Sequence, residues 1–342
     1  MKKNNKTISL KDVSTYSKVS LITVSRTLNQ PNLVSLKTKK IVYNAIEELG
    51  YVPNLNARTL VKRNSNIVGL VVPQLRSSLF ADLAEGLENQ LSKSGLNLLL
   101  AVSNRSQKQE TKAVKTFVGR QADAIVLTGI WHNKECTSLL KSFNGPVIET
   151  CNLKKDPIDL NVGFNNYEAS VKMTKYLIDC GNQSIAVVGN DFQGSDQSSD
   201  RLKGFLHTMK NYNIPIPKEL ILDLEFNDPI KNGYDSLINL MSLTNPPRAI
   251  FYLNELFAHG ALMACNFKNI LVPDAISIAG FGDLNISKYL PVPLTTINID
   301  YTKIGYLSGK YIINSLYQLN QENIVLDVGF DLKIRKSTKS LI

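Results

Sequence analysis

The sequence predicts an α/β protein in which a small helical domain precedes two similar α/β lobes. The N-terminal part carries helix caps and helical periodicity without strand-like runs. From Asn66 onward, short apolar runs alternate with amphipathic segments, a pattern typical of parallel, doubly wound sheets. Because this alternation occurs as two consecutive sets, we expect two lobes in tandem with a cleft between them.

Three short helices are expected in the N-terminal domain. Ser9 and Asp12 have the spacing of a capping box, which predicts a helix from Leu10. Ser20 and Ser35 are suitable caps for a second and a third helix. Gly50 suits the position just past the end of the third helix, where left-handed backbone is common. A helix as short as the second one must be stabilised by packing on the other two.

The second helix has two different faces. Val24 and Leu28 lie on its inner side, and its other face is formed by Ile22, Ser25, Arg26 and Asn29. Three small helices with an exposed, arginine-bearing second helix match the helix-turn-helix plan, in which that helix enters the major groove of DNA. A helical subdomain of another kind is the alternative.

The charge is concentrated in this first domain. Residues 1–63 contain 12 Lys and Arg against 3 acidic residues, a charge of +9, whereas the rest of the chain contains 27 basic and 26 acidic residues. A basic head on a nearly neutral body indicates phosphate binding, because a merely well-solvated surface would spread its charges. Thr38, Lys39 and Lys40, at the start of the third helix, are expected to face phosphates.

Two N-terminal runs, LKDVSTYSKVSLITVSRTLN and EELGYVPNLNARTL, resemble the signature of the lactose-repressor (LacI/GalR) family, and the resemblance covers essentially the whole chain. It implies a transcriptional regulator that binds double-stranded operator DNA as a homodimer. Two-fold symmetry would then predict a palindromic operator with half-sites ~34–36 Å apart. Lys18 departs from the family, which usually has Gly in this turn. We expect the turn to survive this change.

The resemblance also divides the chain. Residues 1–53 are expected to form the helix-turn-helix domain, 54–65 a hinge helix and linker, and 66–342 an effector-binding and dimerisation domain. The last of these is expected to consist of two α/β lobes like those of a periplasmic sugar-binding protein, with crossovers between the lobes near residues 161, 294 and 325.

DNA contacts are expected from the second helix, the third helix and the hinge. The candidates are Leu21, Ile22, Ser25, Arg26, Asn29, Thr38, Lys39, Asn54, Ala57 and Leu60. Arg26 is expected to bind guanine with two hydrogen bonds, and Leu21 and Ile22 to contact thymine methyl groups. The resemblance implies that Leu60 wedges into the minor groove and kinks the duplex. The alternative for Leu60 is packing on the body of the protein.

The two lobes are predicted from consecutive strand and helix segments. The first set comprises the strands IVGLVV, LNLLLAV, DAIVLTG and PVIET, with helices at 80–93, 107–118 and 134–143. The second set comprises LNVGF, SIAVVG, LILDL, AIFYLN and ISIAGFG, with helices at 167–180, 201–212, 229–241 and 255–267.

Ligands of open α/β sheets bind at the carboxyl ends of the strands, so the cleft is the expected effector site. Arg201, in DRLKGF, matches an arginine that reaches the effector in the family. Its expected place at a helix start is unfavourable for a cation, which indicates either an anionic ligand or an intrachain salt bridge. Trp131 follows a strand and is expected either to stack on a sugar or acid or to pack between the lobes.

Within the family, the segments PVIET, DLNVGFNNYEASVKMTKYLI, ISIAGFGDLNI and VLDVGF resemble the gluconate-utilisation repressors, including a glutamate at Glu149. This resemblance implies a sugar acid as effector. Gly282 stands where sugar-binding members have an aspartate acceptor, which disfavours a neutral sugar held in the usual way. The effector-binding candidates are Arg76, Trp131, Glu149, Arg201, Asn254 and Asp283. The alternatives are a neutral or phosphorylated sugar, or an architectural DNA-binding protein without an effector.

Other classes of function lack support in the sequence. There is no nucleophile elbow or phosphate loop, so no enzyme is expected. The four cysteines and three histidines show no metal-ligand spacing, and neither a metal nor a cofactor is expected. No signal peptide or membrane span is evident, which predicts a cytoplasmic protein without a membrane partner.

Overall fold

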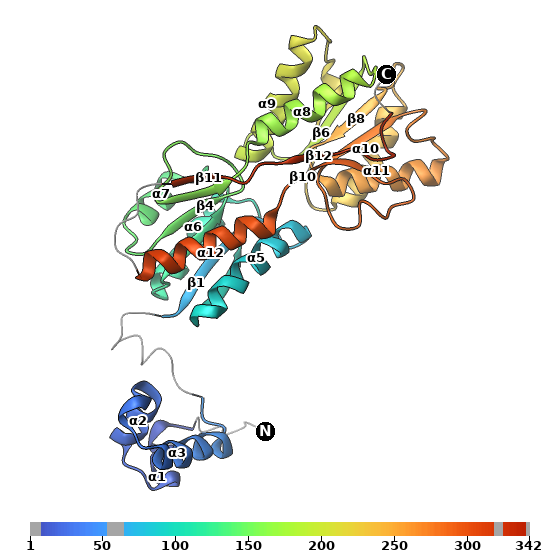
Figure 1. The fold of residues 1–342 in the computed structure, drawn as a ribbon. Helices are drawn as coiled ribbons and strands as arrows, with labels where there is room; N and C mark the ends of the chain where they lie inside the picture. Colours follow the sequence, from blue (N-terminus) through green and yellow to red (C-terminus); the bar gives the residue numbers. More distant parts are fainter. Residues whose placement is uncertain (1–7, 53–64, 318–323, 340–342) are drawn as a thin grey trace. The chain divides into compact units, whose positions relative to one another are not determined.

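The computed structural model describes residues 8–52, 65–317 and 324–339. The chain divides into two compact units, Met1–Ser65 and Asn66–Ile342 (Figure 1). Among the helices of these residues, none combines the length and the apolarity needed to cross a membrane. The hinge candidates Asn54, Ala57 and Leu60 lie outside the described residues.

In the described part of the first unit, residues 8–52, the chain forms three α-helices. These are α1 (Leu10–Ser17), α2 (Leu21–Asn29) and α3 (Leu36–Leu49), with a 3-10 turn at Pro31–Leu33. Ser9 and Asp12 form the predicted capping box, and the hydroxyl oxygens of Ser20 and Ser35 accept hydrogen bonds from backbone amides in the first turns of α2 and α3. Gly50 ends α3 in left-handed backbone, with φ of 60°. The predicted caps of all three helices are therefore confirmed.

A core of four side chains holds these helices together. Val13 from α1, Val24 from α2, and Val42 and Ala45 from α3 are all buried. Lys18 adopts left-handed backbone with φ of 54°, so the turn between α1 and α2 forms although it lacks the usual glycine. The core fixes which face of α2 is turned inward and leaves the opposite face free.

The second unit contains two six-stranded sheets with the same strand order, β11-β5-β4-β3-β1-β2 and β12-β10-β9-β8-β6-β7. The strands of the first lobe are β1 (Ile67–Val72), β2 (Asn97–Val102), β3 (Ala124–Thr128), β4 (Val147–Thr150), β5 (Leu160–Gly163) and β11 (Ile324–Asp327). Those of the second lobe are β6 (Ile185–Gly189), β7 (Ile221–Asp223), β8 (Ala249–Tyr252), β9 (Ser277–Gly282), β10 (Thr295–Asn298) and β12 (Asp331–Lys333).

Helices cover both sheets (Figure 1). They are α5 (Ser78–Leu91), α6 (Gln107–Gly119), α7 (Lys134–Lys141), α8 (Asn166–Asp179), α9 (Asp196–Asn211), α10 (Pro229–Met241), α11 (Glu255–Lys268) and α12 (Tyr301–Tyr317), with short 3-10 turns at Ser92–Ser94 and Lys218–Leu220. The predicted fold class, a helical head followed by two doubly wound lobes, is confirmed.

The structure corrects two details of this prediction. The run LNVGF, expected to open the second set, forms β5, which pairs in parallel with β4 and so completes the first sheet. The last strand, β12, pairs antiparallel with β10 and is the exception among otherwise parallel pairs. The chain changes lobes after β5, after β10 and after β11, whose ends at Gly163, Asn298 and Asp327 lie near the positions 161, 294 and 325.

Helices α5 and α12 lie side by side in the first lobe (Figure 1) and approach closely through glycine. A Cβ atom at Gly86 would lie 2.1 Å from the Thr302 carbonyl oxygen, and one at Gly305 would lie 2.0 Å from the Leu83 carbonyl oxygen. The second lobe repeats this arrangement between α10 and α11, through Gly233 and Gly260. The helix layers of both lobes therefore depend on backbone-to-backbone contact that a side chain would prevent.

Candidate functional site

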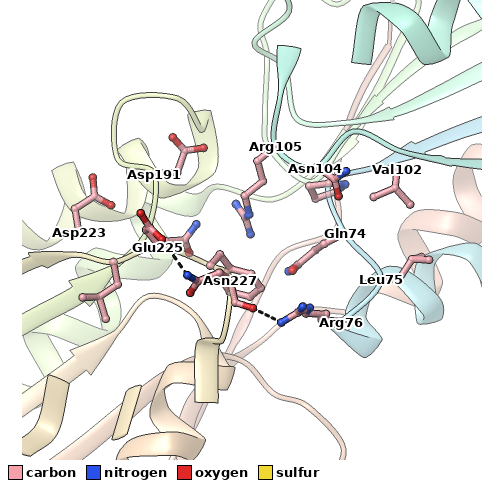
Figure 2. A pocket seen from close by; sticks show the side chains of 14 residues that line it. Gln74, Leu75, Arg76, Val102, Asn104, Arg105, Asp191, Asp223, Glu225 and Asn227 are labelled. Atoms are coloured by element: carbon pink, nitrogen blue, oxygen red, sulfur yellow. Dashed lines mark hydrogen bonds between the residues drawn. The ribbon is translucent and has the colours of Figure 1, made fainter. Parts of the chain in front are cut away.

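A cavity of about 910 Å³ opens between the two lobes, at the carboxyl ends of β1, β2, β6 and β7 (Figure 2). The first lobe contributes Gln74, Leu75, Arg76, Asn104 and Arg105 to its walls. The second lobe contributes Asn190, Asp191, Asp223, Glu225, Phe226 and Asn227. This is the location that the physics of open α/β sheets predicts for a ligand, and its volume is within the range that holds small organic molecules.

The two walls of the cavity differ in charge (Figure 2). Both charged side chains from the first lobe are arginines, Arg76 and Arg105, and the charged side chains from the second lobe are Asp191, Asp223 and Glu225. A ligand between them would meet cations on one side and carboxylates on the other. This favours a molecule with an anionic group at one end and hydrogen-bond donors at the other.

Buried polar atoms without a partner are concentrated in these walls. Among the described residues, five buried side-chain atoms lack a hydrogen bond, and four of them belong to Gln74 (Oε1 and Nε2), Arg105 (Nε) and Asn190 (Nδ2). Leaving such atoms unpaired costs stability, so buried polar groups are normally satisfied. Their convergence on one cavity indicates that a polar ligand completes their hydrogen bonds.

Several contacts cross from one lobe to the other around the cavity. Arg76 donates a hydrogen bond to the carbonyl oxygen of Asn227 (Figure 2), and the Arg105 guanidinium lies 4.8 Å from the centre of the Phe226 ring. Deeper in the cleft, the Asp196 carboxylate accepts a hydrogen bond from the Ile130 amide at 3.0 Å. These contacts hold the two walls together and make the cavity sensitive to the relative positions of the lobes.

Arg201 has its partners within the protein. Its Nε donates to the Asn166 amide oxygen at 2.7 Å and its Nη1 to the Leu253 carbonyl at 2.8 Å, while its guanidinium lies 3.7 Å from the centre of the Phe281 ring. Helix α9 begins at Asp196 and not at Arg201, so the dipole argument for an anionic partner was wrong. No carboxylate of the described residues forms an ion pair with Arg201, and it is not among the residues that line the cavity.

Glu149 is also placed differently from the prediction. Its side chain is fully buried in β4, where it accepts hydrogen bonds from Lys154 Nζ at 2.7 Å and the Ile158 amide at 2.9 Å. His132 lies between two carboxylates, with Nδ1 2.8 Å from Glu110 and Nε2 3.4 Å from Glu149. The carboxylate of Glu149 is therefore occupied in a charge network inside the first lobe and does not face the cavity.

This network brings together metal-ligand types that the sequence did not group. Glu110, His132 and Cys136 place a carboxylate oxygen, a ring nitrogen and a sulfur within 4.8 Å of one another. The ion pairs of His132 already explain this proximity, since the two carboxylates, the imidazolium and Lys154 balance in charge. Burial raises the pKa of the Cys136 thiol to about 12, with Glu110 adding to the shift, so the thiolate form is disfavoured here.

We expect His132 to make the stability of the protein depend on pH. Burial opposes its charged form, but the hydrogen bonds and charges of Glu110 and Glu149 outweigh burial and raise its pKa from 6.5 to about 9. A raised pKa stabilises the fold fully below the unfolded value and loses that contribution as the pH rises through the folded value. Between about pH 7.5 and 9, the wild-type protein should lose roughly 1.5 kcal/mol more unfolding free energy than His132→Gln.

Urea unfolding at several pH values measures this difference. Groups that titrate in both proteins cancel in the comparison. The pH dependence that remains in the difference between the two unfolding free energies is therefore due to His132. Parallel stability curves for the wild-type and His132→Gln proteins would show that His132 is not held in the charged form.

The other effector candidates have different positions. Arg76 lines the main cavity, and Trp131, 41% exposed, lines a smaller hollow next to it that shares Arg105 and Asp191 with the main cavity. Asn254 caps α11 through its side-chain oxygen. Asp283 forms an ion pair with Arg335 at 2.7 Å. The structure thus brings two of the six candidates, Arg76 and Trp131, to the cleft surface.

The space beside Gly282 is taken by Leu79 and Glu255, since a Cβ there would lie 2.9 Å from Leu79 Cδ1 and 3.9 Å from Glu255 Oε2. The Glu255 carboxylate accepts hydrogen bonds from the hydroxyls of Ser287 and Thr296 and from the Asp283 amide. Burial raises its pKa to about 7, although these hydrogen bonds oppose the shift. A Cβ at neighbouring Gly280 would lie 2.9 Å from the Glu255 carboxylate. The carboxylate of Glu255 therefore lies near the place where an aspartate at position 282 would offer its acceptor. Its hydrogen bonds, however, are made to groups of the protein itself.

Sequence reasoning missed Gln74, Arg105 and Asn190. Each follows the end of a predicted strand, within three residues of β1, β2 or β6, which was the available signal. Position after a strand does not show which side chains are turned into the cleft and which lack partners. Only the assembled lobes reveal that.

The outer face of α2 is free of the head's core. Leu21 is 47% exposed, Ile22 is 72% exposed and Arg26 is exposed. Ser25 and Asn29 are half-buried and joined by a hydrogen bond of 3.4 Å. Thr38 and Lys39, in the first turn of α3, are half-buried. The side chain that α2 contributes to the head's core, Val24, lies on the opposite face, so the face that was predicted to read DNA is not occupied by the core.

Two family models match the chain. Residues 9–54 match the model described as "Bacterial regulatory proteins, lacI family", and residues 174–338 match "Periplasmic binding protein-like domain". The HTH-type transcriptional repressor PurR of Pasteurella multocida (strain Pm70) is 26% identical over 332 residues, covering 97% of this chain and 98% of the relative. The HTH-type transcriptional regulator IdnR of Escherichia coli (strain K12) is 26% identical over 329 residues, covering 96% and 98%.

Solved structures show the same fold. A LacI-family transcriptional regulator from Silicibacter pomeroyi superposes with a TM-score of 0.90 at 23% identity, covering 97% of this chain and 100% of that one. The lac repressor dimer bound to operator and an anti-inducer superposes with a TM-score of 0.81 at 22% identity, covering 98% and 100%. The curated relatives are transcriptional regulators, which confirms the prediction of a regulator and not an enzyme. The chain combines a lacI-family DNA-binding domain with a periplasmic-binding-protein-like domain.

Proposed function

We propose that the protein is a homodimeric transcriptional repressor that binds a palindromic operator and is released when a sugar acid such as gluconate occupies the cavity between its lobes. The observation that carries this proposal is the combination of two features in one chain. These are a basic head with an exposed second helix, and a separate unit with a polar cavity between two lobes. An architectural DNA-binding protein would have no use for the second feature.

The DNA-binding half of the proposal rests on α2. Arg26 projects from a helix whose inner face is fixed by Val24, and Leu21 and Ile22 expose large apolar side chains at its start. Exposed apolar side chains of this size are costly in water and useful against thymine methyl groups. An arginine beside them suits a bidentate contact with guanine.

Exposed apolar side chains on the second lobe support a dimer. Helix α11, the segment after it and the loop after β9 expose Met263, Phe267, Leu271, Ile286 and Tyr289, each more than half exposed. Burial of such side chains against a second copy would be favourable. The lac repressor, which shares the fold, was solved as a dimer bound to its operator. A two-fold dimer would present two α2 helices to half-sites ~34–36 Å apart.

The effector half of the proposal rests on the cavity. Arg76 and Arg105 suit a carboxylate, and the carboxylates and amides of the opposite wall suit hydroxyl groups. The similarity of PVIET and ISIAGFGDLNI to gluconate-utilisation repressors supports the same ligand class. Binding would couple to DNA through the relative positions of the lobes, with ~1–3 kcal/mol as the usual scale of such coupling.

Replacing Arg26 by alanine is expected to weaken binding to the cognate operator by ~1–3 kcal/mol and to relax selectivity at one base pair in each half-site, because the bidentate contact to guanine is lost. Selection from a randomised operator library, followed by titration of the selected sites, measures both effects. Arg26→Lys is the matched control, since it keeps the positive charge for phosphate contact but lacks the two parallel N–H donors of the guanidinium group. An alanine variant that selects the wild-type operator would contradict the assignment.

Release by the effector is tested separately. Operator binding is measured with gluconate, with a neutral hexose and with a phosphorylated sugar. Gluconate should reduce operator affinity about 5- to 150-fold. If only the neutral or the phosphorylated sugar released the protein from the operator, the proposal of a ligand-responsive regulator would be supported and the assignment of a sugar acid would be wrong.

A further inference from the structure

We infer that Arg105 is the residue that recognises the acid group of the effector, and that the cavity selects a hydroxyl-rich ligand with a single negative charge. This inference rests on the proposed function, because it concerns the ligand of the same cavity. It arises from the unpaired polar atoms of the cavity walls and not from the family, whose arginine corresponds to Arg201.

Arg105 is held in position without a carboxylate partner. It follows β2 in left-handed backbone with φ of 60°, a conformation that is unfavourable for a side chain of this size and that persists only where the surrounding structure enforces it. One face of its guanidinium is turned to the Phe226 ring of the other lobe. Its Nε is buried and without a hydrogen bond, and no carboxylate of the described residues forms an ion pair with it.

The electrostatic setting of Arg105 favours an incoming anion. Burial lowers the pKa of Arg105 to about 10, Asp191 partly offsets this shift, and the charge of Arg201 adds to it. A guanidinium that is partly desolvated and short of counter-charge gains more from a carboxylate than one exposed to water. Replacing water by a fixed anion would therefore stabilise this side chain.

The other arginines are less suitable. The guanidinium of Arg201 is committed to Asn166 and Leu253, and Phe281 covers its face. Arg76 donates to the carbonyl oxygen of Asn227 and is exposed, so its charge is screened by solvent. Among the three arginines near the cleft, Arg105 alone combines burial, an unpaired donor and a place in the cavity wall.

The remaining wall defines the other end of the ligand. Gln74 offers an unpaired donor and an unpaired acceptor, and Asn190 offers an unpaired donor. Asp191 and Asp223 lie on the opposite side from Arg105 (Figure 2) and can accept hydrogen bonds from hydroxyl groups. Burial raises the pKa of Asp191 and repulsion by Asp223 adds to the shift, while the charge of Arg105 and the hydrogen bond from the Gly194 amide oppose it.

The charges in the cavity limit the charge of the ligand. Two arginines face three carboxylates, so the lining carries one net negative charge. A monoanion can place its carboxylate at Arg105 and its hydroxyls at the acidic wall, whereas a phosphorylated sugar acid would bring further negative charge toward that wall. The geometry therefore points to an unphosphorylated sugar acid.

Calorimetric titration of the full chain tests this inference with three probes: gluconate, 6-phosphogluconate and glucitol, the uncharged polyol of the same length. The wild-type protein should bind gluconate most tightly. Arg105→Gln should lose at least about 30-fold in gluconate affinity, the lower end of the usual cost of removing one partner of a buried charged pair. Its affinity for glucitol should be unchanged. Arg120→Gln, which removes an exposed arginine of the same lobe that does not line the cavity, should leave the gluconate affinity unchanged.

The outcomes separate this inference from the proposed function. If the wild-type protein binds gluconate and Arg105→Gln binds it equally well, the role of Arg105 is overturned while the sugar-acid regulator stands. Preferential binding of 6-phosphogluconate overturns the charge limit. If no probe binds and none changes operator affinity, the proposed effector falls as well. Unliganded operator binding and urea unfolding of each variant show that a lost signal does not reflect misfolding.

Discussion

Replacing Gly305 by alanine is expected to destabilise the first lobe by about 3 kcal/mol, although alanine normally stabilises a helix relative to glycine. The added Cβ would lie 2.0 Å from the Leu83 carbonyl oxygen and 2.7 Å from the Leu87 amide nitrogen. Both are backbone atoms of α5, so no side-chain rotation can relieve the clash. Helices α5 and α12 must separate, which opens the apolar layer beneath them.

Gly119→Ala is the matched control for this experiment. Gly119 is also in a helix, at the end of α6, but a Cβ there meets nothing within 4 Å. This substitution should be neutral or stabilising by up to about 1 kcal/mol. Urea unfolding of the two variants should therefore give changes of opposite sign. Equal changes would mean that α5 and α12 are not packed through Gly305.

Replacing Val24 by aspartate is expected to unfold the head and abolish operator binding. Val24 is one of the four buried apolar side chains that form the core between the three described helices. A buried carboxylate without a partner costs several kcal/mol, which is comparable to the whole stability of so small a domain. Circular dichroism should show a loss of helix that corresponds to the head. Ligand binding by residues 66–342 should remain, since they form a separate compact unit.

Val52→Asp makes the same chemical change at a side chain that is 82% exposed. Its helix content should match the wild-type protein, and its operator affinity should fall only modestly through the added negative charge. If Val24→Asp retained operator binding at this level, the core of the head would be misassigned.

The sequence determined those features whose causes are local. Ser9, Ser20 and Ser35 cap their helices because a cap needs only a side-chain oxygen and the next few amides. The apolar face of α2 and the strand and helix periods of the lobes were predictable for the same reason. They depend on neighbours a few residues apart in the chain.

Tertiary structure alone decided the features that join distant segments. The assignment of β5 to the first sheet depends on its pairing with β4 and β11. Gly86 and Gly305 matter only because α5 and α12, far apart in sequence, touch along their backbones. Likewise, Arg201 is satisfied and Arg105 is not because of partners contributed by other strands and by the second lobe.

The same distinction explains the outcome at the candidate site. The sequence placed the cleft at the ends of parallel strands, since every open α/β sheet gathers its loops there. It did not determine which polar side chains at those ends would lack partners, because each hydrogen bond is made between groups that only the assembled lobes bring within 3 Å or so of each other. The family and the head follow from local pattern, whereas the ligand-reading residues follow from packing.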